Sequence, residues 1–147
     1  MSITGSGLYG LSLEKALIDT LGESWEAEDN RVLMVTDTYT PDFNAHDFYA
    51  DITNEVTGTG YTAGGELLTT TEITLSGGVL TFDAADVAWT TSTIANAMAA
   101  VLKTTVSGSA TDQLILLSDF VTAASSSGGT FTIQWSASGI ATVDYVP

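Results

Sequence analysis

The fold class follows from residues 130–135, Thr-Phe-Thr-Ile-Gln-Trp. Apolar and polar residues alternate through this stretch, as they do in a β-strand that has one buried and one solvated face. Phe131, Ile133 and Trp135 would then point into a core, while the threonines and the glutamine face water. The stretch predicts a half-buried strand and makes a β-protein the first expectation for the whole chain.

Further short strands are expected before and after this stretch, separated by clusters of Gly, Ser, Asn and Asp. Gly77-Gly78 is typical of a hairpin turn. The apolar run at residues 114–117 indicates a strand covered on both faces. The expected strands are 31–36, 67–75, 79–82, 87–89, 114–117, 130–135 and 140–145. With residues 94–103 they predict a mainly β, single-domain antiparallel β-sandwich or jelly roll.

Some stretches allow two interpretations or predict loops. Residues 94–103 are rich in alanine, which favours a helix, but their neighbours are strands, which favours a strand. Residues 46–52 are ambiguous. Residues 57–65 (Thr-Gly-Thr-Gly-Tyr-Thr-Ala-Gly-Gly) predict a loop or wide turn, and residues 125–129 (Ser-Ser-Ser-Gly-Gly) predict a mobile loop.

The first 30 residues differ from the remainder. Residues 1–7 are small and predict a flexible arm. Leucine and alanine then recur at helical spacing, which predicts one short amphipathic helix over residues 12–21. Ser12 could cap its start, and Gly22 stands where it would stop. We therefore expect an arm with a helix over 1–30 and a β-sandwich domain over 31–147.

Composition excludes several classes of function. The 147 residues include 18 Asp and Glu but only 3 Lys and Arg, which gives a formal net charge of −15. Such a chain lacks the cations that bind nucleic acid or an anionic membrane surface. It has no run of about 20 apolar residues that would span a membrane, and no signal peptide is visible. Without cysteine it can form no disulfide.

The candidates for catalysis are weak. His46 is the only histidine, and no nucleophile elbow accompanies it. Gly5-Ser-Gly-Leu-Tyr-Gly10 has dinucleotide-site spacing but too few residues before it for a core strand. The acidic residues Asp37, Asp42, Asp47 and Asp51, and the pair Asp83 and Asp86, leave open a structural calcium site or, less readily, glycosidase chemistry. We expect no catalytic residues, no metal and no cofactor.

Aromatic residues offer a different kind of binding site. Trp25, Trp89, Trp135, Tyr61 and Tyr145 could line a carbohydrate platform. Aromatic side chains in strands belong to the core more often. Trp25 precedes an acidic patch and could instead pack the helix onto the sheet.

The order of motifs resembles a family of small structural proteins of tailed bacteriophages and prophages. The most specific motifs are Tyr-Thr-Pro-Asp (39–42), Gly-Tyr-Thr-Ala-Gly-Gly (60–65) and Phe-Asp-Ala-Ala-Asp-Val-Ala-Trp (82–89). The resemblance covers nearly the whole chain and implies a non-enzymatic virion component, foremost a capsid decoration (cement) protein. It also favours a strand for residues 94–102.

This resemblance defines the expected partners and location. The protein would bind the major capsid protein from outside the shell, because an acidic protein is repelled by packaged DNA. We expect a homo-oligomer, a trimer, in the virion and in the host cytoplasm during assembly. Tail, connector or head-fibre placement and a carbohydrate-binding adsorption module are the alternatives.

The N-terminal region is the first candidate for the contact surface and residues 58–65 are the second. The arm could contact the capsid or a sister subunit, and the sequence leaves this open. The candidate contact residues are Ile3, Leu8, Tyr9, Leu13, Leu17, Trp25 and Tyr61.

Overall fold

Two antiparallel sheets form the protein. The computed structural model describes residues 3–20, 22, 24–105 and 111–146. Its elements are β1 (Gly7–Leu8), α1 (Gly10–Leu17), β2 (Arg31–Thr36), the 3₁₀ turn η1 (Tyr49–Asp51), β3 (Gly58–Thr59), β4 (Glu66–Leu67), β5 (Glu72–Ser76), β6 (Val79–Asp83), β7 (Val87–Lys103), β8 (Leu114–Ile133) and β9 (Ala141–Asp144). In the described residues no helix has the length and apolar character needed to cross a membrane.

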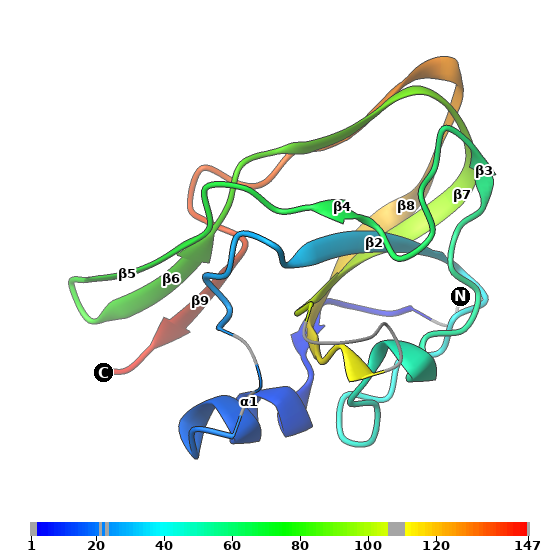
Figure 1. The fold of residues 1–147 in the computed structure, drawn as a ribbon. Helices are drawn as coiled ribbons and strands as arrows, with labels where there is room; N and C mark the ends of the chain where they lie inside the picture. The colour runs from blue at the N-terminus through cyan, green and yellow to red at the C-terminus, as the bar shows by residue number, and fades with distance from the viewer. Residues whose placement is uncertain (1–2, 21, 23, 106–110, 147) are drawn as a thin grey trace.

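The larger sheet has the strand order β1-β8-β7-β2-β4, and β3 pairs with the middle of β7, at Thr93 and Ile94. The smaller sheet has the order β5-β6-β9 and lies to one side of the larger sheet, above helix α1 in the view of Figure 1. Every pairing is antiparallel. The sequence-based prediction of a mainly β, sandwich-like fold with one short helix is confirmed.

β7 and β8 pair with each other as a long antiparallel ribbon, which makes up much of the fold. Its pairing runs from Lys103↔Leu114 to Val87↔Ile133 and contains several register shifts. Three non-glycine residues within it, Thr91, Asn96 and Val121, have positive φ angles of 50°, 56° and 65°. Irregularities of this kind bend and twist a strand pair. The ribbon bends near its middle, so that its two halves run in different directions (Figure 1).

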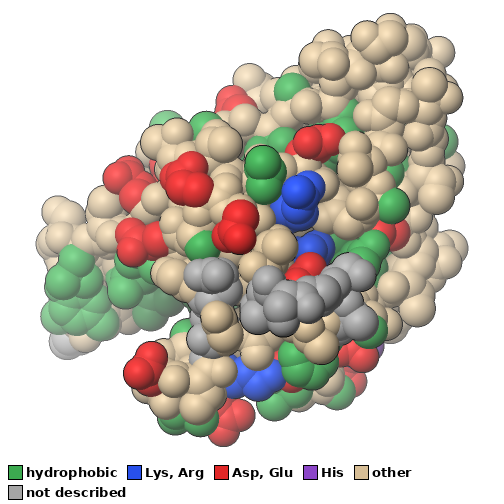
Figure 2. All heavy atoms as spheres, in the orientation of Figure 1, with side chains coloured by type: hydrophobic (Ala, Val, Ile, Leu, Met, Phe, Trp, Pro, Cys, Tyr) green, Lys and Arg blue, Asp and Glu red, His purple; other side chains and the backbone are tan. Residues whose placement is uncertain are grey.

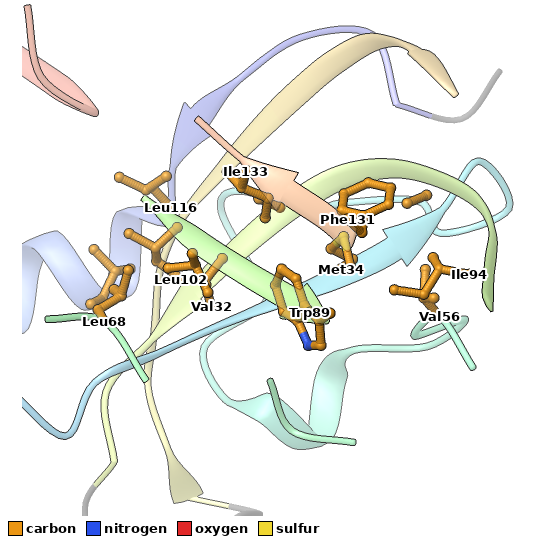
Figure 3. Packing of buried hydrophobic residues seen from close by; sticks show 14 of the residues in the cluster. Val32, Met34, Val56, Leu68, Trp89, Ile94, Leu102, Leu116, Phe131 and Ile133 are labelled. Carbon is orange, nitrogen blue, oxygen red and sulfur yellow. The ribbon is translucent and has the colours of Figure 1, made fainter. Parts of the chain in front are cut away.

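The bend gathers one large hydrophobic cluster. Trp89 and Phe131 come from the outer half of the ribbon, which ends at the Val87↔Ile133 pair. Leu102 and Leu116 come from the inner half, which ends at the Lys103↔Leu114 pair. Met34 of β2 belongs to the same cluster (Figure 3). Trp89 meets Phe131 edge-on, with ring centroids 6.3 Å apart. Phe131 and Ile133 are buried as predicted, whereas Trp135 is only half-buried and donates from Nε1 to the carbonyl of Ala85 at 3.2 Å.

Residues 94–103 form the inner half of β7, so the strand interpretation is correct. Side chains on one face, including Ala100 and Leu102, join the large cluster. Those on the other face, including Met98 and Val101, join a second cluster. Alanine suits this position because the strand is covered on both faces. Residues 114–117 are buried on both faces for the same reason, as predicted.

The prediction of a mobile loop at residues 125–129 is wrong, because this stretch lies inside β8. Serine hydroxyls here bond to the neighbouring strand. Ser126 Oγ accepts from the Ile94 N–H at 3.2 Å and lies 2.8 Å from Ser92 Oγ. Ser125 Oγ accepts from the Asn96 N–H at 3.0 Å. These side-chain hydrogen bonds take the place of part of the backbone–backbone hydrogen bonding between β7 and β8 at the bend. A stretch with the composition of a loop therefore forms part of a strand.

The strand expected over residues 67–75 is interrupted. β4 ends at Leu67 and β5 begins at Glu72, with Thr70 at a φ of 55° between them. The carboxylate of Glu28 accepts from the N–H groups of Thr70 and Thr71, both at 3.2 Å. The Gly77-Gly78 hairpin is confirmed, since both glycines have positive φ and β5 pairs with β6. The last expected strand is present as β9.

The stretches 46–52 and 57–65 are mostly irregular. The first contains η1, and the second contains β3 within the expected loop. Gly65 closes this loop with a φ of 87°, and a Cβ there would lie 2.2 Å from the carbonyl oxygen of Val32. Only glycine fits so close to the neighbouring backbone.

Candidate functional site

The N-terminal segment is packed against the large sheet, unlike the flexible arm expected from its composition. Ile3 and Tyr9 are fully buried and share the second cluster with Leu33 and Val101. β1 adds two residues to the edge of β8, and Leu8 packs on the large cluster. Met1 and Ser2 lie outside the described residues. Ile3 and Tyr9 are therefore residues that fix the segment in place and present no surface to a partner.

A chain of hydrogen bonds fixes the same segment to the loop before η1. Tyr9 Oη lies 3.0 Å from Tyr39 Oη, which lies 2.8 Å from His46 Nδ1. Burial raises the pKa of Tyr9. The Asp51 carboxylate accepts from the backbone N–H groups of Phe48 and Asp47, both at 2.9 Å, and these bonds lower the pKa of Asp51. His46 thus belongs to a structural network.

Helix α1 follows directly and is shifted from the expected range of 12–21. Tyr9 is the N-cap residue, and Ser12 Oγ is buried with no hydrogen-bond partner, so Ser12 does not cap the helix. The helix stops at Leu17 because Asp19 takes a left-handed conformation with a φ of 57°, three residues before Gly22. Lys15 forms an ion pair with Asp47, which ties the helix to the loop before η1.

An apolar groove lies between this helix and the small sheet, with a volume of about 560 Å³. One wall is the helix, and the other is formed by β5, β6 and β9. Trp25 lies at the groove with its ring centroid 6.2 Å from that of Phe82, so it packs the segment after the helix against β6. The lining side chains include Leu13, Ala16, Leu17, Trp25, Ile73, Leu80 and Val143.

Large apolar side chains are exposed at this groove. Leu17 is 78% exposed and Val143 is 43% exposed, while Ile18 next to the helix is 61% exposed. Leu75 on β5 and Tyr145 after β9 extend the apolar surface beyond the groove. Hydrophobic side chains gather over the small sheet in Figure 2. Contiguous apolar surface of this kind marks interaction sites in soluble proteins.

Negative charge lies on the helix side of the apolar surface. Asp19 lines the groove and Glu14 is exposed on its helix, whereas Glu72 and Asp144 alternate with Ile73 and Val143, which line the groove, and so lie on the opposite face of the small sheet. All three cations of the chain make contacts elsewhere. Lys15 pairs with Asp47, Lys103 pairs with Asp112 in the interior, and Arg31 donates to the carbonyl of Gly65 at 2.8 Å. The groove therefore has an acidic rim on its helix side.

Three of the predicted contact residues, Leu13, Leu17 and Trp25, come together at this groove. Tyr61 does not join them. Its ring stacks on Trp89 at 5.8 Å, and its hydroxyl donates to Glu55 at 2.7 Å and accepts from the Met34 N–H at 3.0 Å. Burial raises the pKa of Tyr61. The loop at residues 58–65 is thus anchored inward through its tyrosine.

The sequence did not identify the wall of the groove that comes from the small sheet. Ile73, Leu80 and Val143 lie in expected strands, but no pattern in those strands distinguishes an open face from a covered one. Their role becomes visible only when the helix is placed opposite them.

The acidic clusters proposed for metal binding do not assemble. Within the described ranges, no three His, Cys, Asp or Glu residues are grouped so that they could hold a metal ion. Asp51 bonds to backbone N–H groups, Asp47 pairs with Lys15, and Asp42 accepts from the N–H groups of Asn44 and Ala45. Asp86 accepts from the Trp135 N–H at 2.9 Å. These carboxylates have structural contacts.

A scan against protein-family models, a search of curated proteins and a search of solved structures found no match to this chain.

Proposed function

We propose that this protein is a non-enzymatic structural component of a tailed-phage virion, a decoration protein that binds the major capsid protein from outside the shell. The observation that carries the proposal is the exposed apolar groove with its acidic rim. Such a surface suits docking to another protein, because apolar burial supplies free energy and the charged rim restricts the choice of partner.

The anchoring of the groove supports a binding role. Its helix is held by the Lys15–Asp47 ion pair and by the buried Tyr9, and its other wall is a hydrogen-bonded sheet. A binding surface fixed before contact loses little conformational entropy when a partner arrives. The net charge of −15 supports a position outside the shell, because packaged DNA repels an acidic protein.

The proposal includes a homotrimer bound at repeated positions on the lattice. In a symmetric shell, several linked contacts multiply a modest affinity per subunit. Sedimentation analysis of the purified protein tests this part, and a monomer at all concentrations would contradict it.

The carbohydrate-binding alternative gains no support from the aromatic residues. Trp89 is buried, the ring of Tyr61 stacks on that of Trp89, and Trp25 packs against Phe82. They do not form one exposed platform. Tail, connector and head-fibre placement use the same kind of docking surface and differ from decoration in copy number.

Quantitative mass spectrometry of purified particles tests the proposal. We expect a copy number that scales with that of the major capsid protein, and labelling on the outer surface of the head. A small fixed number of copies per particle would move the protein to the tail or connector. Normally assembled particles that contain none of it, or turnover of a substrate by the purified protein, would refute the structural role.

A further inference from the structure

We propose that the groove between α1 and the small sheet binds an amphipathic segment of a partner protein, whose apolar side chains enter the groove while flanking Lys or Arg side chains meet its acidic rim. This inference deepens the proposed function and rests on it for the identity of the partner, which would then be the capsid protein.

The shape and lining of the groove suit an apolar occupant. A volume of about 560 Å³ lies within the range of sites that enclose a ligand or several side chains. Leu13 and Leu17 project from the helix, while Leu80 and Val143 line the opposite wall. An amphipathic segment laid in such a groove places one apolar face against both walls, as in other helix-in-groove complexes.

Charge selects the occupant of the groove. Asp19 lines the groove, Glu14 is exposed on its helix, and Lys15 is paired with Asp47. A second copy of this chain would bring the same carboxylates to the rim, so like charges would face each other. An anionic lipid surface is opposed in the same way. A partner segment with Lys or Arg beside its apolar residues complements the rim.

Two matched double variants separate the groove from the general acidity of the protein. Leu17→Gln with Val143→Thr changes two exposed residues of the groove. Leu67→Gln with Val121→Thr makes the same chemical changes at exposed residues that do not line it. All four side chains are exposed, so both proteins should fold, which circular dichroism and thermal unfolding verify.

The probe is an amphipathic helical peptide of leucine and lysine, about five turns long. Its counterpart has glutamate in place of lysine. Fluorescence anisotropy should show that the Leu/Lys peptide binds the full chain, that the groove variant binds it at least about tenfold more weakly, and that the control variant is unchanged. Affinity should fall between about 50 mM and about 500 mM salt. Absence of binding, equal binding by the groove variant, or equal binding of the Leu/Glu peptide would overturn the inference.

A second assay distinguishes this inference from the proposed function. Shells that lack the protein are mixed with the wild-type chain and with each double variant, and bound protein is measured after sedimentation. Failure of the wild type to bind would contradict the decoration role. Binding by the wild type that persists in the groove variant, or that strengthens with salt, would leave decoration intact and overturn the groove as its site. If the groove variant breaks up an oligomer of the free protein, a second copy occupies the groove and the inference is wrong.

Discussion

The ion pair between Lys103 and Asp112 should dominate the stability of the β7–β8 hairpin. Lys103 is the last residue of β7, and Asp112 lies just before β8. Both side chains are 3% exposed, and Lys103 Nζ also lies 5.1 Å from the ring centroid of Tyr49. Lys103→Met removes the cation and leaves a carboxylate in the interior without that partner.

The expected cost is large relative to the stability of a small domain. Removing one member of a buried ion pair typically costs about 3–5 kcal/mol, because the remaining charge is still desolvated. Domains of this size have unfolding free energies of about 5–15 kcal/mol. Lys103→Met should therefore remove about a fifth or more of the free energy of unfolding. Lys103→Met combined with Asp112→Asn removes both charges and should be more stable than Lys103→Met alone.

Urea unfolding followed by tryptophan fluorescence measures these differences. The matched control is Lys15→Met, because the Lys15–Asp47 pair is partly exposed, with side chains 24% and 14% accessible. That change should cost about 1 kcal/mol or less. A loss below about 1 kcal/mol for Lys103→Met would refute the reasoning, and so would a double variant whose loss equals the sum of its two single losses.

Three further predictions concern the backbone, pH and the N-terminal segment. Gly65→Ala should lower the melting temperature markedly in calorimetry, because its Cβ would meet the β2 backbone, whereas Gly5→Ala has open space and should have little effect. The lowered pKa of Asp51 contributes stability that is present above the ordinary aspartate pKa and is lost as pH falls through the lowered value. Asp51→Asn should thus cost about 0.5–2 kcal/mol in urea titrations near pH 7 and less near pH 3; an equal cost at both pH values would contradict this. Deleting residues 1–9 should destabilise the fold itself, since it removes the buried Ile3 and Tyr9, each worth about 2–5 kcal/mol; unchanged urea unfolding would refute the anchoring role.

Strands with a strong local pattern could be predicted from the sequence, and those decided by distant partners could not. The alternation at Phe131 and Ile133 needs only the two-residue period of a strand. Ala97, Ala99 and Ala100 have no such signal, because their conformation is set by burial between two clusters. Ser125 and Ser126 belong to a strand because of hydroxyl contacts with residues about 30 positions earlier in the chain.

Only one of the two walls of the candidate groove could be predicted from the sequence. The helical spacing of Leu13 and Leu17 identified one wall, although the helix itself starts and ends earlier than predicted. The burial of Ile3 and Tyr9 was missed because a segment rich in small residues resembles an arm whether or not two large side chains anchor it. Of the two interpretations of Trp25 that the sequence allowed, a carbohydrate platform and packing of the helical region onto the sheet, its contact with Phe82 favours the second.

The bent β7–β8 ribbon has a consequence for how the molecule opens. Because one hairpin contributes Leu102 and Leu116 near its loop and Trp89 and Phe131 near its ends to the same cluster, neither half can separate without exposing that cluster to water. Amide hydrogens along both halves should therefore exchange with deuterium through the same global event.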